Sequence, residues 1–525
     1  MRITNKIMQN NNLNNINNNK ILQDKLSTQM STEKKVNKPS DDPVVAIRAL
    51  RLRSNVTEAT QYYSKNIPDA NSWLEITEGA LKNTAQVLTK MIGQCTKGAN
   101  GDLTSEDREI ILEQLKAIRD EVYSTANVDY AGRYVFAGYR TDTTISFTAN
   151  QKLKYSVTEQ LSGNAMDEVA FIKTTGAGGD LKDINSANFE TINVSEQEVE
   201  AVKVNRIRLA YDQLDEGTIP TISHVTGKDA DGNIQTEEVI AASDIAMVHS
   251  YDVPSAFEQA AANDDKAYFI PETGELILGK NVYAKLAAYQ DDISTSGVNE
   301  GEIRITYEKT NWEKGDLRPE HYFACTTTDD EGTVIDYNQE YLTGNNIEKQ
   351  VIEYDVGFNQ TIRVNTTADE CFKPGIGREV DDLVKALEEV QVLEKTATDI
   401  KTMIQNETDE TKAGTLKSRL DAVNKALTLS KDKMQKMFEH SITVMQNYLG
   451  EDNLSITACG TRSSKLELIE NRMRDQKTTY ETLKSENEDV DITEAAIHLK
   501  SANVTYQAAL MATGKVMQNS LLNYL

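Results

Sequence analysis

The chain has 525 residues and a formal net charge of −26, with 56 lysines and arginines against 82 aspartates and glutamates. Because so acidic a chain is repelled by a phosphate backbone, nucleic acid is excluded as an expected partner. Only 8 prolines and 2 tryptophans are present, and this composition favours long exposed helices over a compact enzyme core.

In the first thirty or so residues, apolar residues are separated by many asparagines, as in N10-N-N-L-N-N-I-N-N-N19. Asparagine is a poor interior helix former, so a helix of this sequence is marginal in isolation. We expect another surface to order it, either its own C-terminus or neighbouring subunits. A disordered tail is the alternative. The apolar positions are Ile3, Ile7, Leu13, Ile16, Leu22, Leu26 and Met30.

The stretch N37-K-P-S-D-D-P43 combines a cluster of acids with two prolines. Clustered acids can bind a metal or serve acid/base chemistry, but a helix start explains them as well. Proline is favoured at the first helical position, which assigns it to Pro43. Asp42 then becomes the N-cap, and Ser40 and Asp41 add acceptors and negative charge at the positive helix end. The stretch therefore predicts a helix cap.

A long helix follows from Val45 to K97-G-A-N-G101, with coiled-coil-like apolar spacing. Its apolar stripe runs to Tyr63 and then drifts by one position to Ile67. A second helix begins at T104-S-E-D107, which resembles a capping box, and ends near A131-G132. The next residues, R133-Y-V-F-A-G-Y-R140, have strand-like composition.

Residues 145–372 have short periodicity and many turns, which predicts one or two β-rich domains with a helical piece near 255–262. Turns are expected at G176-A-G-G-D180, D229-A-D-G232 and D329-D-E-G332. The predicted strands are 153–157, 168–172, 302–307, 333–337, 350–356 and 361–364.

Helical periodicity returns after P374-G-I-G-R378 and continues to about Leu449, with a break near N406-E-T-D-E410. A second stripe then runs from Leu466 to Leu483. The final helix follows E486-N-E-D-V-D-I-T493 and continues to the last residue. Its apolar positions include Leu499, Tyr506, Leu510, Met517, Leu521, Leu522 and Tyr524.

Apolar helical seams at both ends require the two ends to lie together. The fold class is therefore mixed α and β and multidomain, a discontinuous α-helical rod formed from both termini with inserted β-rich outer domains. We expect residues 1–40 to pair with 488–525 as an assembly segment. We expect 41–145 to pair with about 376–487 as the rod, and 146–375 to form the insertion.

Residues with catalytic or metal-binding spacing are lacking. None of the five histidines is three or four positions from another, and no H-E-x-x-H is present. The four cysteines are far apart, so neither a disulfide framework nor a zinc site is expected. The loop D229-A-D-G-N233 reaches its glycine too early for a calcium loop. The sequence therefore predicts no enzyme activity, no cofactor and no metal.

No secretory signal and no run of roughly 18 apolar residues is present, so we expect no membrane insertion. The protein is then expected either in the cytoplasm or outside the cell by a route that uses no cleaved signal.

Several of these stretches resemble the sequences of a known protein family. R2-I-T and Q29-M-S-T-E-K-K-V-N-K-P-S-D-D-P43, with Pro39 at its centre, resemble the start of bacterial flagellin-like proteins. Within that group the chain resembles the hook-associated protein 3 family of hook–filament junction proteins. Arg133, Tyr134, Phe136 and Gly138 match its R-Y-x-F-A-G block. The C-terminal residues 495–525 resemble its last helix, and G460-T-R462 resembles a turn opening the returning helix.

The chain departs from the family at two places. Glu33 stands where the family has glycine, and Ser146-Phe147 stands where the R-Y-x-F-A-G block usually continues to Pro-Phe. The resemblance is strong over roughly 1–145 and 455–525 and weak between them.

The resemblance implies an extracellular structural subunit of the flagellum, exported unfolded through the flagellar type III channel. It implies a ring of about eleven subunits, with hook-associated protein 1 and flagellin as neighbours. An export chaperone is expected to hold the C-terminal helix. Flagellin itself is the nearest alternative. A helical cell-surface scaffold or adhesin, and an enzyme inserted in the middle, are further alternatives.

Overall fold

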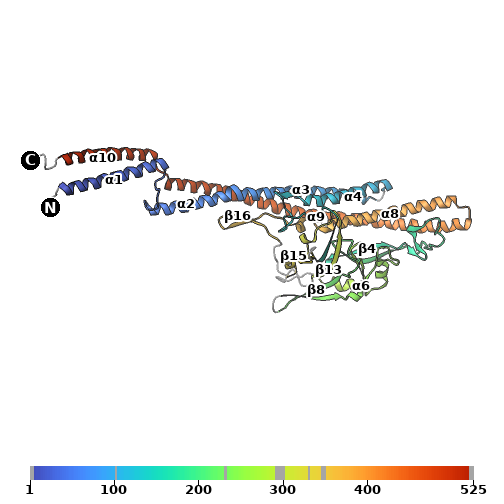
Figure 1. The fold of residues 1–525 in the computed structure, drawn as a ribbon. Coiled ribbons are helices and arrows are strands. Elements are labelled where there is room, and N and C mark those ends of the chain that lie inside the picture. Colours follow the sequence, from blue (N-terminus) through green and yellow to red (C-terminus); the bar gives the residue numbers. More distant parts are fainter. Residues whose placement is uncertain are drawn as a thin grey trace, which may run out of the picture. The chain divides into compact units, whose positions relative to one another are not determined.

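The computed structural model describes residues 5–100, 103–229, 233–289, 302–328, 332–343 and 350–518. It confirms the predicted fold class, since both ends of the chain are helical and the sheets come from residues between them (Figure 1). The chain divides into two compact units. The smaller comprises Met1–Asn71, Tyr354–Ile362 and Ser464–Leu525, and the larger comprises Ser72–Glu353 and Arg363–Ser463.

The helices follow the predicted order. The first long helix is interrupted by one π-helical turn at Tyr62–Asn66, and the break between α8 and α9 falls at residues 407–409. The helices are α1 Asn5–Thr32, α2 Pro43–Gln61, α3 Ile67–Gly98, α4 Ser105–Ala126, α5 Ala256–Ala262, α6 Lys280–Ala287, α7 Ala368–Cys371, α8 Pro374–Asn406, α9 Glu410–Glu488 and α10 Ile492–Gln518. None of them, within the described residues, has both the length and the apolar character needed to cross a membrane.

Most strands belong to two sheets of the larger unit. The six-stranded sheet has the order β15-β14-β3-β13-β8-β9, and the five-stranded sheet has the order β10-β11-β12-β7-β4. Their bounds are β3 Gln151–Leu161, β4 Met166–Ile172, β7 Ala201–Arg208, β8 Thr221–Lys228, β9 Ile234–Ile240, β10 Ile245–Met247, β11 Ala267–Ile270, β12 Glu275–Leu278, β13 Ile303–Trp312, β14 Ala324–Thr328 and β15 Val334–Tyr337.

Three short hairpins complete the strands: β1 Asp129–Tyr130 with β2 Arg133–Tyr134, β5 Thr175–Gly176 with β6 Gly179–Asp180, and β16 Glu353–Gly357 with β17 Gln360–Arg363. All ladders of the six-stranded sheet are antiparallel. In the five-stranded sheet, β10 and β11 run parallel. In the six-stranded sheet, only the neighbours β8–β9 and β14–β15 follow each other in the sequence, and the other neighbouring pairs are joined by long connections.

The long helices of the larger unit share one apolar core. Cys459 of α9 contacts the Leu74 carbonyl of α3 through its Sγ at 3.4 Å, and Ser441 Oγ of α9 donates to Glu379 Oε1 of α8 at 2.5 Å. Large side chains removed from water contribute about 1.5–3 kcal/mol each. The buried set includes Leu74, Leu81, Leu88, Met91, Ile111, Leu115, Val122, Val380, Leu383, Leu387, Val390, Phe438 and Met445.

Buried ion pairs attach the five-stranded sheet to α8. Arg206 of β7 is 8% exposed, and its Nη2 lies 2.5 Å from Asp382 Oδ2 of α8. The same guanidinium pairs with Glu275 of β12 and, at 2.9 Å, with Asp167 of β4. Burial alone would raise the pKa of Asp382. The two arginines Arg206 and Arg208 outweigh burial and hold that pKa below its ordinary value.

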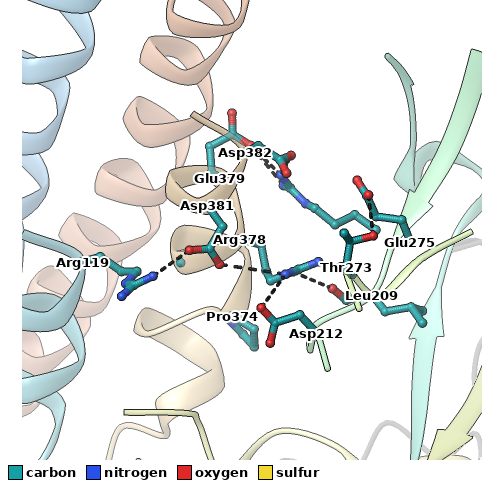
Figure 2. A network of polar contacts seen from close by, with 12 residues as sticks. Arg119, Leu209, Asp212, Thr273, Glu275, Pro374, Arg378, Glu379, Asp381 and Asp382 are labelled. Atoms are coloured by element: carbon teal, nitrogen blue, oxygen red, sulfur yellow. Dashed lines mark hydrogen bonds and ion pairs between the residues drawn. The ribbon is translucent and has the colours of Figure 1, made fainter. Parts of the chain in front are cut away.

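Figure 2 shows how the first turns of α8 continue this network. Arg378 donates from Nε to the Leu209 carbonyl at 3.1 Å and lies beside Asp212 at 3.5 Å. On the other side of the helix, Asp381 accepts from Arg119 of α4 at 2.7 Å. Polar pairs therefore hold α8 to the sheet on one side and to α4 on the other.

Two predictions about local structure are wrong. R133-Y-V-F-A-G-Y-R140 is strand only at Arg133–Tyr134, because Gly138 adopts a φ of +61° and turns the chain. Gly460 opens no turn and lies inside α9. The packing of Cys459 and Leu466, both buried on either side of it, outweighs the cost of about 1 kcal/mol for glycine in a helix.

The strand prediction was incomplete. All six predicted strands have a counterpart, but β7 to β12 and β14 were not predicted, and neither were the short strands β1, β5 and β6. The predicted helical piece near 255–262 is α5. The turns predicted at 229–232 and 329–332 fall largely outside the described residues, and residues 175–180 form the β5–β6 hairpin.

Candidate assembly surface

Helix α1 has no buried side chain among residues 6–32. Its apolar side chains on one face, Ile16, Leu26 and Met30, are half-buried, whereas Leu13 and Ile21 are 55% and 67% exposed. A helix with so little burial and so many asparagines gains little stability by itself. The helix therefore keeps apolar side chains available for another surface.

Helix α10 lies alongside α1 in the smaller unit (Figure 1). Gln23 Nε2 donates to Asn503 Oδ1 at 2.5 Å between the two helices. Over residues 492–515 of α10, the buried apolar side chains are the small ones of Ala495 and Ala502, and the larger ones are half-buried or exposed. Small residues allow the two helices to approach closely, but they bury little apolar area.

Most of the large apolar side chains that are exposed in the described residues belong to the smaller unit. Each of them leaves apolar area in water that burial against another surface would remove at a gain in free energy. They lie on α1, α2, the end of α9 and α10. The set, called here the apolar helix surface, is Ile7, Met8, Leu13, Ile21, Leu22, Val44, Ile47, Leu50, Leu468, Leu483, Ile492, Ile497, Val504, Leu510 and Met511.

The predicted assembly residues fall into three groups. Leu510 is 46% exposed, while Leu499 and Tyr506 are half-buried. Met517 lies in α10, and Leu521, Leu522 and Tyr524 lie outside the described residues. Sequence reasoning also named Ile7, Leu13, Leu22 and Leu483 of the apolar helix surface. It missed the other members because it followed a single stripe on each helix. Apolar residues off that stripe, such as Ile21 and Val504, were the available signal.

The acidic cluster caps α2. Asp42 Oδ1 accepts from the Val44 and Val45 backbone N–H groups at 3.0 and 3.1 Å, and Pro43 occupies the first helical position. Asp41 closes the preceding turn, since its carboxylate accepts from Lys38 N–H at 3.1 Å. The acids therefore serve as acceptors for backbone N–H groups at the start of the helix.

Beside the cap, Pro39 and Ser40 form the turn that leads into the helix, and both are exposed. The chain just before this turn pairs with the α9–α10 connection. Lys35 N–H donates to the Glu488 carbonyl at 2.7 Å, and Val490 N–H donates to the Glu33 carbonyl at 3.0 Å. Glu33 itself has a φ of +58°. That left-handed conformation favours glycine. Glycine is the residue at this position in the family that the sequence resembles.

The side chain of Glu488, which is 4% exposed, also holds these two segments together. The paired residues 33–35 and 488–490 are called here the corner of the smaller unit. Arg53 binds the Glu488 carboxylate with two hydrogen bonds of 2.6 and 2.7 Å, and Lys34 lies 3.7 Å away. The hydrogen bonds from Arg53 lower the pKa of Glu488 below its ordinary range. Because the pKa of Glu488 is lower in the folded state than in the unfolded chain, its pair with Arg53 stabilises the corner at neutral pH. That stabilisation is lost as the pH falls through the folded-state pKa.

The R-Y-V-F-A-G residues lie in the larger unit and not in the assembly surface. Phe136 packs edge-on against Phe372, with ring centroids 4.9 Å apart, and its carbonyl accepts from Ala368 N–H at 3.0 Å. The Arg133 guanidinium lies 4.9 Å from the Trp73 ring centroid. A Cβ at Gly138 would collide with the Gln350 side chain. Together with Tyr134 in β2, these residues pack and turn the chain.

The comparisons with known proteins agree with the helical organisation. Residues 3–141 match the family described as the bacterial flagellin N-terminal helical region. The match covers about a quarter of the chain, at its N-terminal end. The matched region ends just after the R-Y-V-F-A-G block, and it contains the cap at Asp42 and the helices α1 to α4.

Two curated relatives match part of the chain. The flagellar hook-associated protein 3 of Salmonella typhimurium is 34% identical over 143 residues, which are 27% of this chain and 45% of that protein. A flagellin of Clostridium tyrobutyricum is 28% identical over 127 residues, 24% of this chain and 33% of that protein. The chain thus matches about half the length of the first relative and a third of the second.

Among solved structures, the flagellar junction protein FlgL from Legionella pneumophila aligns with 85% of this chain and 100% of its own. The identity is 10% and the TM-score is 0.27, which is too low to support an argument.

Proposed function

We propose that this chain is a structural subunit of the bacterial flagellum at the junction between hook and filament. The apolar helix surface is the observation that carries the proposal. A protein that exposes Leu13, Leu50 and Leu510 in solution has apolar area to bury when it assembles. Burial contributes about 1.5–3 kcal/mol per large side chain before the costs of ordering and association.

The flagellin-type N-terminal region supports a flagellar role, and the higher identity to a hook-associated protein 3 favours the junction over the filament. Self-assembly into a ring of about eleven subunits would seat α1 and α10 of one copy against those of its neighbours. Hook-associated protein 1 and flagellin would contact the two ends of the ring. In this role the protein is extracellular and has no catalytic function.

The decisive experiment removes the gene and images the cells. We expect hooks without filaments, with flagellin shed into the medium, and restoration of filaments by the intact gene. Normal filaments in the deletion strain would contradict the junction role. If the purified chain alone polymerises into long filaments, the protein is a flagellin.

A variant lacking residues 1–32 tests the surface itself. It removes α1 and leaves the core of the larger unit intact, so we expect a folded protein that fails to restore filaments. The control is a variant in which Lys203, on the other unit and 69% exposed, is changed to alanine. Filament formation by the truncated variant would show that α1 is not needed for assembly.

An export chaperone is proposed to bind α10. Leu510→Asp should reduce chaperone capture because it places a charge in the apolar helix surface. Gln507→Asp, at an exposed polar position of the same helix, is the matched control and should bind normally. Equal capture of both variants would place the chaperone site elsewhere.

A further inference from the structure

A cluster of three side chains lies in the larger unit. Glu216, His249 and Glu272 bring one nitrogen and two carboxylate oxygens within 4.8 Å of one another. His249 Nδ1 and Glu272 Oε1 are 2.6 Å apart. The three residues come from three separate loops of the sheet region.

Backbone hydrogen bonds hold these loops together independently of the cluster. The loop after β7 is fixed to the β11–β12 turn, since Leu214 N–H donates to the Pro271 carbonyl at 2.9 Å and Gln213 N–H donates to the Glu272 carbonyl at 3.2 Å. The segment after β10 is joined to β11 by the bond from Val248 N–H to the Phe269 carbonyl at 2.9 Å. The ligand-bearing backbone is therefore already in place.

The immediate surroundings orient the imidazole. Asp252 accepts from the His249 backbone N–H at 2.8 Å, and the Tyr251 ring stacks parallel to the imidazole with centroids 5.1 Å apart. Within the described part of the chain, neither Glu216 nor Glu272 forms an ion pair with an arginine or lysine. Two carboxylates and an imidazole that lack a fixed counter-cation form a site of negative charge.

We propose that Glu216, His249 and Glu272 bind one divalent transition-metal ion of the zinc or manganese class. One imidazole nitrogen with two carboxylates suits such ions, while a calcium site would use oxygen ligands alone. Two ligand atoms on one ion at about 2.1 Å are roughly 3 to 4.2 Å apart. A pair near the 4.8 Å limit therefore closes slightly on binding. His249 Nδ1 and Glu272 Oε1, now 2.6 Å apart, separate slightly as the ion replaces their shared proton.

The three side chains are accessible to solvent, and they do not fill all coordination positions of an ion. Glu216 is exposed, whereas His249 and Glu272 are 27% and 21% exposed at their side chains. Three protein ligands leave further positions of the ion to water. Such an ion would join the loops after β7, β10 and β11 and would stabilise the folded state of the larger unit in proportion to its concentration.

The test titrates the full chain, first freed of metal with a chelator, with Zn²⁺, Mn²⁺ and Ca²⁺ in separate calorimetric experiments. We expect one saturable site that binds Zn²⁺ more tightly than Mn²⁺, following the general order of divalent affinities. His249→Ala should weaken Zn²⁺ binding by more than about tenfold, because even outer groups around a metal change affinity by that factor. Co²⁺ should give a visible absorption spectrum that the His249→Ala variant lacks.

Glu216→Gln is the second variant, since its exposed side chain can be changed without disturbing the fold, and it should also weaken binding. The matched control is His498→Ala, which removes an exposed imidazole 3.4 Å from Glu494. The proposal is overturned if no saturable Zn²⁺ or Mn²⁺ binding occurs. It is also overturned if both site variants bind like the unaltered chain, or if Ca²⁺ binds more tightly than Zn²⁺.

Discussion

The smaller unit exposes Leu13, Leu50 and Leu510, while the larger unit buries Leu81, Leu383 and Phe438 completely. The same contrast holds for charge. Arg53 at the corner of the smaller unit is half exposed, whereas Arg206 in the larger unit is buried among three carboxylates. The larger unit therefore buries most of its large apolar side chains and pairs its buried arginine, whereas the smaller unit leaves more of its large apolar side chains in water.

Among the predicted changes in the free energy of unfolding, the largest is expected from breaking the buried ion network of the larger unit. Arg206→Ala leaves Glu275 buried without its ion-pair partner and leaves Asp382 with Arg208 alone, which is expected to cost about 3–5 kcal/mol of unfolding free energy. Urea denaturation followed by circular dichroism measures it. Lys203→Ala, on the same strand but in a pair that is 69% and 57% exposed, is the control and should change stability by less than about 1 kcal/mol. Equal losses would mean that burial of the network is unimportant.

Two leucines test the contrast in apolar burial directly. Leu383→Ala empties a fully buried position of α8 and should destabilise the chain by about 2–5 kcal/mol. Leu13→Ala changes a side chain that is 55% exposed, and we expect less than about 0.5 kcal/mol. The same urea titration serves both variants. A large loss for Leu13→Ala in the isolated chain would show that α1 is already well packed.

The larger unit also contains one buried carboxyl group without compensation. Asp452 is fully buried, neither of its oxygens has a hydrogen-bond partner among the described residues, and burial raises its pKa to about 7. The folded state holds this proton while the unfolded chain releases it near pH 4. Stability should therefore fall as the pH rises from about 4 to about 7 and stay low above it.

Asp452→Asn removes that dependence. The variant should be more stable than the unaltered chain by roughly 1–3 kcal/mol at pH 8, and about equal to it at pH 4. Unfolding free energies at the two pH values provide the measurement. A constant difference between the proteins at both pH values would show that Asp452 does not titrate in this range.

The smallest effect is expected at the corner of the smaller unit. Glu33→Gly places glycine at a φ of +58° and should stabilise the local structure by up to about 1 kcal/mol. Slower amide exchange at Val490, whose N–H donates to the residue 33 carbonyl, is the expected signal. Faster exchange there would mean that the flexibility of glycine outweighs the relief of strain.

Local features of the fold could be predicted because neighbouring residues determine them. The cap at Asp42 follows from an acid before proline, and the capping box at Thr104 follows from Asp107 three positions later. Both need only the backbone N–H groups of the next turn. The apolar stripes of α3, α8 and α10 likewise follow from helical spacing alone.

Features that join distant residues could not be predicted. The strand β7 has arginine at an inward position, which breaks the apolar alternation, and its partner Asp382 lies 176 positions away on α8. The metal-site residues come from three loops, so no spacing in the sequence brings them together. The apolar helix surface was predicted only in part because exposure depends on which face each neighbouring helix covers.

The π-helical turn at Tyr62–Asn66 accounts for the one-residue drift of the apolar stripe after Tyr63. Such a turn takes up one residue more than an α-helical turn, so Ala59 before it and Ile67 after it are both buried in the same unit. These residues are therefore the place where the chain can lose one residue and keep the same face inward. A deletion elsewhere in the helix would rotate every later side chain by about 100°.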